Sequence, residues 1–109
     1  MSEDELPEVD VHEAARRQHD GVLLIDVREP DEYAEVHDAG ARLLPLSDLT
    51  NRADEVPRDQ PILVICRSGA RSANAARWLN ERGASATNVA GGTLAWVEAG
   101  LPTASGPAS

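Results

Sequence analysis

Two short stretches of the chain are entirely apolar, at residues 22–25 and 62–65, and polar residues follow each of them. Runs of this length without alternation are typical of strands that a parallel sheet buries on both faces. A further core strand is expected at residues 87–89 and a weaker one at residues 42–44. The apolar pattern therefore predicts a small sheet of buried strands.

Helical patterns separate these strands along the sequence. Asp10 followed by Glu13 has the form of a capping box, and Gly83 is suited to end a helix that follows the second apolar run. Strands that alternate with helices are typical of an α/β fold with a largely parallel sheet. The helices are expected at residues 10–18, 30–36, 47–55, 73–82 and 93–99.

The two ends of the chain differ from its body. Residues 1–7 are acidic, and residues 103–109 are small or rich in Pro, Gly and Ser, so both segments are expected to be flexible tails. The remaining residues, 8–102, are enough for one hydrophobic core and too few for two. One α/β domain is therefore expected.

Charge and composition narrow the function classes. The chain has 10 Lys and Arg against 19 Asp and Glu, a net charge of −9, which argues against binding to nucleic acid or to an anionic membrane. No apolar run is long enough to span a bilayer, and the N-terminus is acidic where a signal peptide is basic, so a cytoplasmic location is expected. The single Cys has no partner for a disulfide and no zinc-site spacing, so neither a metal nor a cofactor is expected.

The only cysteine, Cys66, follows the second apolar run and begins a small basic turn. A lone cysteine is most often a small buried hydrophobe. Here, however, a glycine permits N–H groups to converge, a helix follows, and two arginines lie nearby, all of which stabilise a thiolate and bind anions. Cys66 is therefore interpreted as a nucleophile. The turn that would bind its substrate comprises Arg67, Ser68, Gly69, Ala70, Arg71 and Ser72.

Polar residues, Asp26 and Arg28, also follow the first apolar run. The carboxyl ends of parallel strands meet at one edge of a sheet, where ligands bind, so Asp26 and Arg28 are expected at the same edge as Cys66. A supporting role is favoured for them, because ion pairs also occur at strand ends. They would orient the turn or pair with groups such as Glu29 and Glu32.

Four segments, in their order along the chain, are similar to the rhodanese family. They are residues 26–29 (Asp-Val-Arg-Glu), 32–33 (Glu-Tyr), 66–72 and 91–96 (Gly-Gly-Thr-Leu-Ala-Trp), within a resemblance that covers about residues 9–102. The resemblance implies an α/β fold with about five mainly parallel strands and helices on both faces of the sheet. It also implies a sulfurtransferase whose cysteine carries a sulfane sulfur as a persulfide.

The reaction that the resemblance implies has two halves. The thiolate of Cys66 takes the outer sulfur of an anionic donor such as thiosulfate and releases sulfite, while N–H groups of residues 67–72 hold the persulfide and any oxyanion. Arg67 and Arg71 would attract the donor and lower the pKa of the thiol. A small acceptor, cyanide or a thiol, or else a protein acceptor, then removes the sulfur. This acceptor must be external, because the chain has no second cysteine.

The segment around His37 departs from the family pattern. Family members often carry a Gly-His-Ile-Pro-Gly-Ala-type segment, whereas this chain reads Val-His-Asp-Ala-Gly-Ala at residues 36–41. His37 is interpreted as a residue that structures its loop, since the chemistry needs no histidine base. Trp78 and Trp96 are expected to fill the core.

Two other classes of function fit parts of the sequence. Cysteine phosphatases and arsenate reductases resemble Cys-x5-Arg, often with His before the Cys, whereas Cys66 and Arg71 form a Cys-x4-Arg arrangement after Ile65. The shorter turn is expected to suit sulfur better than a phosphoryl group. The other alternative is a rhodanese-like module that relays sulfur to a protein, docks a partner or senses redox state without strong turnover of small molecules.

Overall fold

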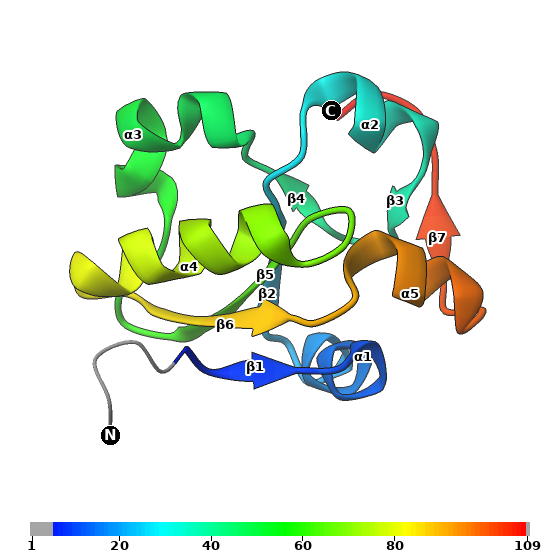
Figure 1. Cartoon of the computed structure of the whole chain (residues 1–109), viewed down its shortest axis with the longest axis horizontal. Helices are drawn as coiled ribbons and strands as arrows, with labels where there is room; N and C mark the ends of the chain where they lie inside the picture. Colours follow the sequence, from blue (N-terminus) through cyan, green and yellow to red (C-terminus); the bar gives the residue numbers. More distant parts are fainter. Residues whose placement is uncertain (1–5, 109) are drawn as a thin grey trace.

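A five-stranded sheet forms the centre of the protein, in the order β1-β6-β5-β2-β4 with every pair parallel. The computed structural model describes residues 6–108, and Figure 1 shows the arrangement of the strands. They are β1 (Glu8–Val9), β2 (Leu23–Asp26), β4 (Arg42–Leu43), β5 (Pro61–Ile65) and β6 (Ser85–Val89). The expected α/β fold is confirmed, and β1 is a strand that the apolar pattern did not predict.

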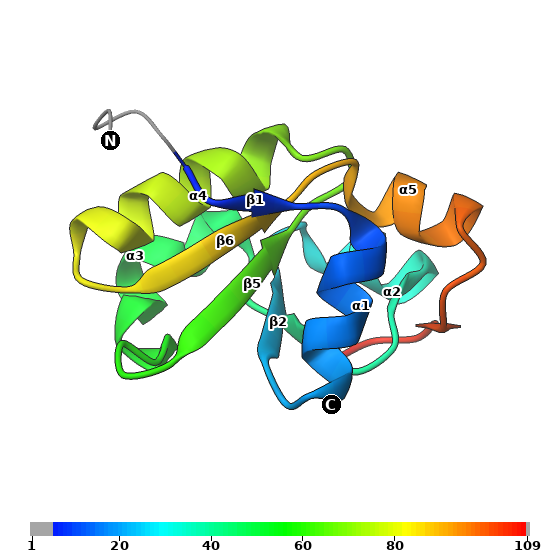
Figure 2. The ribbon, with the colours of Figure 1, turned by 90° about the horizontal axis from the view of Figure 1, so that it is seen from below.

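Helices cover both faces of this sheet, as expected (Figures 1 and 2). Successive residues of a strand point to opposite faces. Leu24 therefore packs in one core with residues of α1, α2 and α5, and Ile25 packs in the other core with residues of α3 and α4. Burial on both faces explains why β2 and β5 are apolar throughout. The helices are α1 (Val11–His19), α2 (Pro30–Glu35), α3 (Leu49–Arg52), α4 (Ala70–Glu81) and α5 (Gly92–Glu98).

A second, small sheet lies apart from the first. Its two strands, β3 (His37–Asp38) and β7 (Thr103–Ala104), pair antiparallel. The segment at residues 103–109 was expected to be a flexible tail, but its first two residues form β7 and belong to the folded domain. Pairing with β3 gives their backbone groups hydrogen-bond partners that the local sequence does not reveal.

The start of the chain also contacts the domain. Most of the acidic tail expected at residues 1–7 lies outside the described residues, and only Leu6 and Pro7 fall within them. Leu6 packs against the core on the α4 face, and the Pro7 carbonyl accepts a hydrogen bond of 2.9 Å from the Asn88 N–H. These contacts align β1 with β6.

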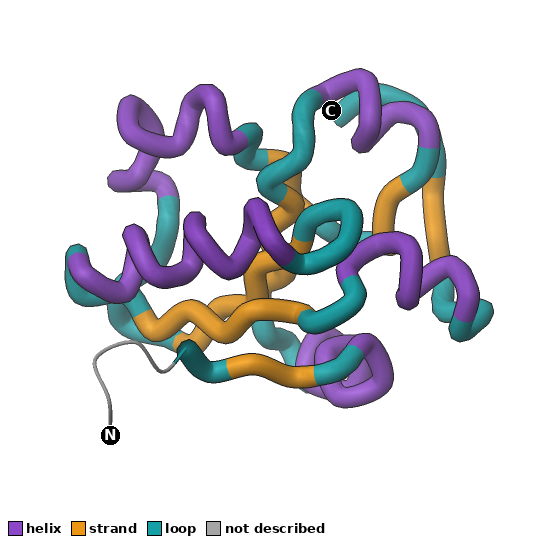
Figure 3. The backbone as a smooth tube through the Cα atoms, in the orientation of Figure 1, coloured by secondary structure: helices purple, strands orange, loops and turns teal. Residues whose placement is uncertain are grey.

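Two of the predicted helices differ from the observed ones by more than one residue at a boundary, and Figure 3 shows how the helices are distributed along the backbone. The cap at the start of α1 is as predicted, since the Asp10 carboxylate accepts the Glu13 N–H at 2.9 Å. Helix α4, by contrast, begins at Ala70, three residues before the predicted start. The single helix predicted at residues 47–55 is three short turns: η1 (Leu46–Asp48), α3 and η2 (Ala53–Glu55). Within residues 6–108, no helix is long and apolar enough to cross a membrane.

His37 and the two tryptophans have packing roles, as expected. The His37 ring stacks on the Tyr33 ring, with 3.6 Å between centroids, and its Nδ1 lies 2.6 Å from the Tyr33 carbonyl oxygen. Trp96 is buried, and its Nε1 donates to the Pro102 carbonyl at 2.8 Å. Trp78 packs, partly buried, against the core on the α4 face.

Candidate active site

Cys66 lies at the edge of the sheet where the parallel strands end. In the register between β2 and β5, Asp26 lies opposite Ile65, so the residues that follow the two strands come together at this edge. The Cys66 side chain is only 1% exposed and packs in the core on the α4 face. The thiol is therefore buried, as an inert core cysteine would be. It lies, however, at the edge where open parallel sheets bind ligands.

The turn after Cys66 wraps around the sulfur. Gly69 has a φ of +113°, a conformation that L side chains rarely adopt, and its N–H donates to Cys66 Sγ at 3.1 Å. Ser72 Oγ lies 3.2 Å from the same sulfur. Because α4 begins at Ala70, Ser72 belongs to the first turn of this 12-residue helix. The sulfur therefore lies beside a helix N-terminus, where the dipole favours negative charge.

The surroundings of Cys66 favour ionisation of the thiol. Burial raises the pKa of Cys66, whereas hydrogen bonds from the Ser72 hydroxyl and from N–H groups of Ser72, Gly69 and Ser68 lower it. The hydrogen bonds outweigh burial, so the pKa of Cys66 lies below the ordinary value for a thiol. A depressed pKa makes the thiolate, the nucleophilic form, more available near neutral pH.

Arg71 is engaged in an ion pair with α2. Its Nη1 and Nη2 lie 2.7 and 2.8 Å from the two carboxylate oxygens of Glu32. Hydrogen bonding to Arg71 lowers the pKa of Glu32 to about 2, so the pair remains ionised throughout the neutral range. The anion-binding role expected for Arg71 therefore competes with an existing bidentate partner.

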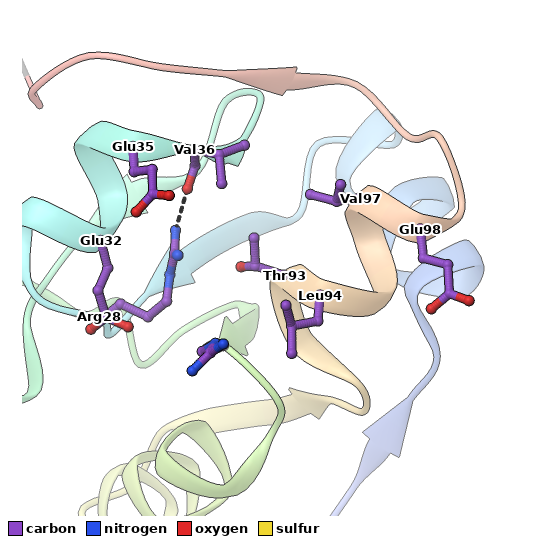
Figure 4. Close-up of a pocket in the computed structure, with 9 residues that line it drawn as sticks. Arg28, Glu32, Glu35, Val36, Thr93, Leu94, Val97 and Glu98 are labelled. Atoms are coloured by element: carbon purple, nitrogen blue, oxygen red, sulfur yellow. Dashed lines mark hydrogen bonds between the residues drawn. The ribbon is translucent and has the colours of Figure 1, made fainter.

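A cavity of about 490 Å³ lies beside the turn, and Arg67 lines it. Figure 4 shows other residues of its lining, from Glu32 and Glu35 of α2 to Leu94 and Val97 of α5. From α5, Leu94 and Val97 border this cavity and are 52% and 47% exposed. Thr93 lines it too, and its buried hydroxyl has no hydrogen-bond partner among the described residues. No ion pair involves Arg67 within residues 6–108. Arg67 is therefore the more accessible of the two cations of the turn.

The start of α5 holds the backbone of the active turn in place. The N–H groups of Thr93 and Leu94 donate to the carbonyl oxygens of Cys66 and Arg67 at 2.8 and 3.1 Å. Gly92, with a φ of +60°, approaches so closely that a Cβ there would overlap these same backbone atoms. The Gly-Gly turn predicted at residues 91–92 therefore permits a contact that positions the backbone of Cys66 and Arg67.

Asp26 and Arg28 form a buried pair with each other rather than with Glu29 or Glu32. Arg28 Nη2 lies 2.8 Å from Asp26 Oδ2, and the side chains are 5% and 0% exposed. Arg28 Nη2 also donates to the Val36 carbonyl at 2.7 Å, a bond drawn in Figure 4. The pair thus connects the end of β2 to the segment after α2.

Two residues that sequence reasoning did not single out reach the site from the neighbouring strands. Asn88 on β6 lies within hydrogen-bonding distance of Ser72, and Glu8 on β1 contacts Asn88. The only available signal was a polar residue within the predicted core strand 87–89. The contact partners of Asn88 depend on strand register, which the sequence alone does not give.

Comparison with known proteins gives consistent matches. A family model for the Rhodanese-like domain matches residues 10–99. A sulfurtransferase of Allochromatium vinosum is 38% identical over 98 residues, covering 87% of this chain and 92% of the relative. The thiosulfate sulfurtransferase GlpE of Actinobacillus pleuropneumoniae is 35% identical over 86 residues, covering 78% and 80%. Two other curated relatives are longer, and the chain covers 59% and 49% of their lengths.

The fold has a solved counterpart of the same kind. The crystal structure of a rhodanese-related protein from Thermoplasma volcanium superposes with a TM-score of 0.83 at 30% sequence identity. The match covers 90% of this chain and 97% of that one. Sequence and structure therefore agree over nearly the whole chain.

Proposed function

The chain belongs to the rhodanese-like domain family of sulfurtransferases and sulfur carriers, and we propose that it transfers a sulfane sulfur through a persulfide on Cys66. Thiosulfate is the proposed donor, and cyanide or a thiol is the proposed acceptor. Membership of the family does not by itself identify the nucleophile or the donor, and we assign these roles to Cys66 and to thiosulfate.

In the first half of the reaction, the Cys66 thiolate attacks the outer sulfur of thiosulfate. A new S–S bond forms to Sγ as the S–S bond of thiosulfate breaks, and the electron pair of that bond leaves with sulfite. The charge of the persulfide then lies on its outer sulfur, near the N–H groups of the turn. Gly69 N–H, which already donates to Sγ at 3.1 Å, belongs to this set of donors.

In the second half, the acceptor attacks the outer sulfur of the persulfide. The Cys66–sulfur bond breaks, its electron pair returns to Sγ as thiolate, and thiocyanate or an organic hydrodisulfide departs. Cys66 is the single cysteine of the chain, so no thiol within the same chain can take the sulfur. Turnover thus depends on the external acceptor.

The observation that carries the proposal is the environment of the Cys66 sulfur. A structural core thiol needs no donors, whereas this one accepts a backbone N–H and lies against a hydroxyl at the start of a helix. The same contacts lower its pKa against the effect of burial. The fold places it at the edge where ligands bind.

A donor panel tests the proposal. Thiosulfate, an organic persulfide and mercaptopyruvate are each offered with cyanide, and thiocyanate is measured. We expect thiosulfate to support turnover and Cys66→Ser to abolish it. Full thiocyanate production by the serine variant would show that another group carries the sulfur, and turnover with the other donors alone would overturn the choice of thiosulfate.

A sulfur relay to a protein is the second candidate, and the exposed apolar side chains of Leu94 and Val97 favour it. They border the cavity beside the turn, and clustered exposed apolar residues often mark protein contacts. A relay would load Cys66 with one sulfur but turn over slowly with cyanide. Comparing the amplitude of one loading cycle with the steady-state rate separates a relay from an enzyme of small molecules.

A further inference from the structure

A row of three polar side chains, Glu8, Asn88 and Ser72, connects the edge of the sheet to Cys66. Glu8 and Asn88 lie opposite each other in the register of β1 and β6, and Asn88 Nδ2 donates to Glu8 Oε2 at 2.8 Å. Asn88 Oδ1 lies 2.6 Å from Ser72 Oγ, which lies 3.2 Å from Cys66 Sγ. Asn88 and Ser72 are 1% and 0% exposed, so water does not compete for these contacts.

The orientation of the Asn88 amide is fixed by its neighbours. Its nitrogen faces two groups that only accept hydrogen bonds, the Glu8 carboxylate at 2.8 Å and the Gly69 carbonyl at 3.2 Å. Turning the amide by half a turn would place its oxygen against both acceptors, which is unfavourable. The amide oxygen therefore faces Ser72 as an acceptor.

The Ser72 hydroxyl has one proton for several acceptors. Its oxygen lies 2.6 Å from the Asn88 oxygen and 3.2 Å from the Cys66 sulfur, and a hydroxyl donates to one of them at a time. While Cys66 is a neutral thiol, its S–H can donate to Ser72 Oγ and the Ser72 proton can stay with Asn88. Each polar group that links Asn88, Ser72 and Cys66 then has a hydrogen-bond partner.

Loss of the Cys66 proton to solvent changes this arrangement. A thiolate only accepts, so the Ser72 proton is drawn toward sulfur and the buried Asn88 oxygen loses its donor. A buried acceptor without a donor is costly. The Asn88 oxygen therefore disfavours rotation of the Ser72 hydroxyl toward the sulfur. Glu8 holds the Asn88 amide with this oxygen facing Ser72.

We propose that Asn88, held by Glu8, is a positioning residue that sets whether the Ser72 hydroxyl donates to the Cys66 sulfur. In the persulfide the charge lies on the outer sulfur, so the Ser72 proton can return to Asn88 after sulfur is loaded. The Ser72 hydroxyl then donates its hydrogen bond to Sγ only while Sγ is a thiolate. A role of this network in catalysis rests on the proposed function. The choice of the Ser72 hydroxyl between Asn88 and Cys66 as acceptor does not.

The test measures alkylation of Cys66 by iodoacetamide against pH, without any sulfur donor. Asn88→Leu removes the competing oxygen. Glu8→Ala removes the nearer of the two acceptors of the amide nitrogen, so that only the Gly69 carbonyl, at 3.2 Å, opposes a turn of this nitrogen toward Ser72. Both variants should lower the pKa of Cys66 by about one unit, whereas mere loosening of the site would raise it toward the ordinary value. Glu8→Gln keeps an acceptor for Asn88 and should restore the wild-type profile.

The Ser72→Ala background is the decisive control. If Asn88 acts through the hydroxyl, Asn88→Leu and Glu8→Ala should not shift the alkylation profile in this background. Equal shifts with and without the hydroxyl, as removal of charge alone would give, would overturn the proposal, as would a raised pKa in the single variants. Because Glu8 is exposed on a strand at the edge of the sheet, Glu8→Ala tests the proposal even if Asn88→Leu fails to fold.

The other charged groups near Cys66 stay unchanged in these variants. They are Arg67, which follows Cys66 and is exposed, Arg71, which is paired with Glu32, and the buried pair of Asp26 and Arg28. The readout is also separate from sulfur transfer. If thiocyanate production fails but the alkylation profiles shift as expected, the proposed function alone is wrong. If thiocyanate is produced but the alkylation profiles do not shift as expected, the role of Asn88 alone is wrong.

Discussion

At the scale of single residues, the two arginines of the active turn differ in the charge that they can offer to a substrate. Arg71 is bound by both oxygens of Glu32, while Arg67 lines the neighbouring cavity. A cation with a bidentate carboxylate attracts a second anion weakly, because the two charges largely cancel. Binding of an anionic donor should therefore depend on how firmly Glu32 holds Arg71.

We expect Glu32→Gln to lower the KM for thiosulfate by about three- to tenfold, the effect of about 1 kcal/mol from one partly exposed charge. Gln keeps an oxygen for the Glu29 N–H, which Glu32 Oε1 accepts at 3.1 Å, but releases Arg71. Steady-state kinetics at several thiosulfate concentrations measure this. Glu35→Gln removes the same charge from the same cavity without freeing Arg71, so equal effects of the two variants would contradict the explanation.

The local structure around the candidate site could be predicted from the sequence. A buried strand, a turn and the start of a helix follow one another around Cys66, Gly69 and Ser72, in the predicted order. Asn88 and Glu8 were missed, since their contacts with the site depend on the packing of β6 against α4 and on its pairing with β1. Arg28 pairs with Asp26 and not with Glu29 or Glu32, because the sequence does not determine which rotamer the Arg28 side chain adopts.

At the scale of elements, the contact between α5 and the active turn depends on Gly92. A Cβ there would overlap the backbone of Cys66 and Arg67, and backbone atoms move less readily than side chains. We expect Gly92→Ala to lower the free energy of unfolding by about 3 kcal/mol, measured in urea.

Gly100→Ala is the matched control for this prediction. Gly100 also has a positive φ, +72°, but its Cβ would meet open space, so only the cost of the left-handed conformation remains, about 1 kcal/mol. Equal losses of stability in Gly92→Ala and Gly100→Ala would show that the contact with the turn is unimportant.

The short strand β3 contains a carboxyl group in an unusual environment. Asp38 is fully buried, and neither carboxylate oxygen has a hydrogen-bond partner among the described residues. Burial, helped by the negative charge of Asp26 and partly offset by Arg28, raises the pKa of Asp38 to about 7 from 3.8. The folded protein therefore keeps this proton up to a pH at which the unfolded chain has released it.

This difference in proton binding predicts how stability depends on pH. The contribution of Asp38 is fully present below about pH 4 and is lost as pH rises to about 7, by up to about 4 kcal/mol. Thermal unfolding between pH 5 and 8 should therefore show a larger decline for the wild type than for Asp38→Asn. The exposed Asp31→Asn serves as control, and identical pH profiles of all three proteins would contradict the account.

Elements with a strong pattern of their own were predicted, and elements that depend on a neighbour were not. The apolar strands β2 and β5 and the capped helix α1 carry their signals within the segment itself. The two-residue strands β1, β3 and β7 form because a partner strand satisfies their backbone groups, so no local pattern marks them. The early start of α4 likewise follows from the conformation of Gly69.

At the scale of the whole molecule, the net charge of −9 should repel an anionic donor. Near the site, the exposed charge of Arg67 is offset by Glu35 and Glu98, which line the same cavity. We expect the kcat/KM for thiosulfate to rise as salt increases from about 0.01 M to about 0.15 M, because screening weakens the repulsion. A decline over this range would show instead that local positive charge steers the donor.

The proposed transfer depends on sulfur loading of Cys66, because the chain has one cysteine. Intact-mass measurement after incubation with thiosulfate and removal of the excess detects this loading. We expect a gain of one sulfur atom in the wild type, reversal by cyanide and no gain in Cys66→Ser. An unchanged mass in the wild type, or the same gain in the serine variant, would show that Cys66 does not carry the sulfur.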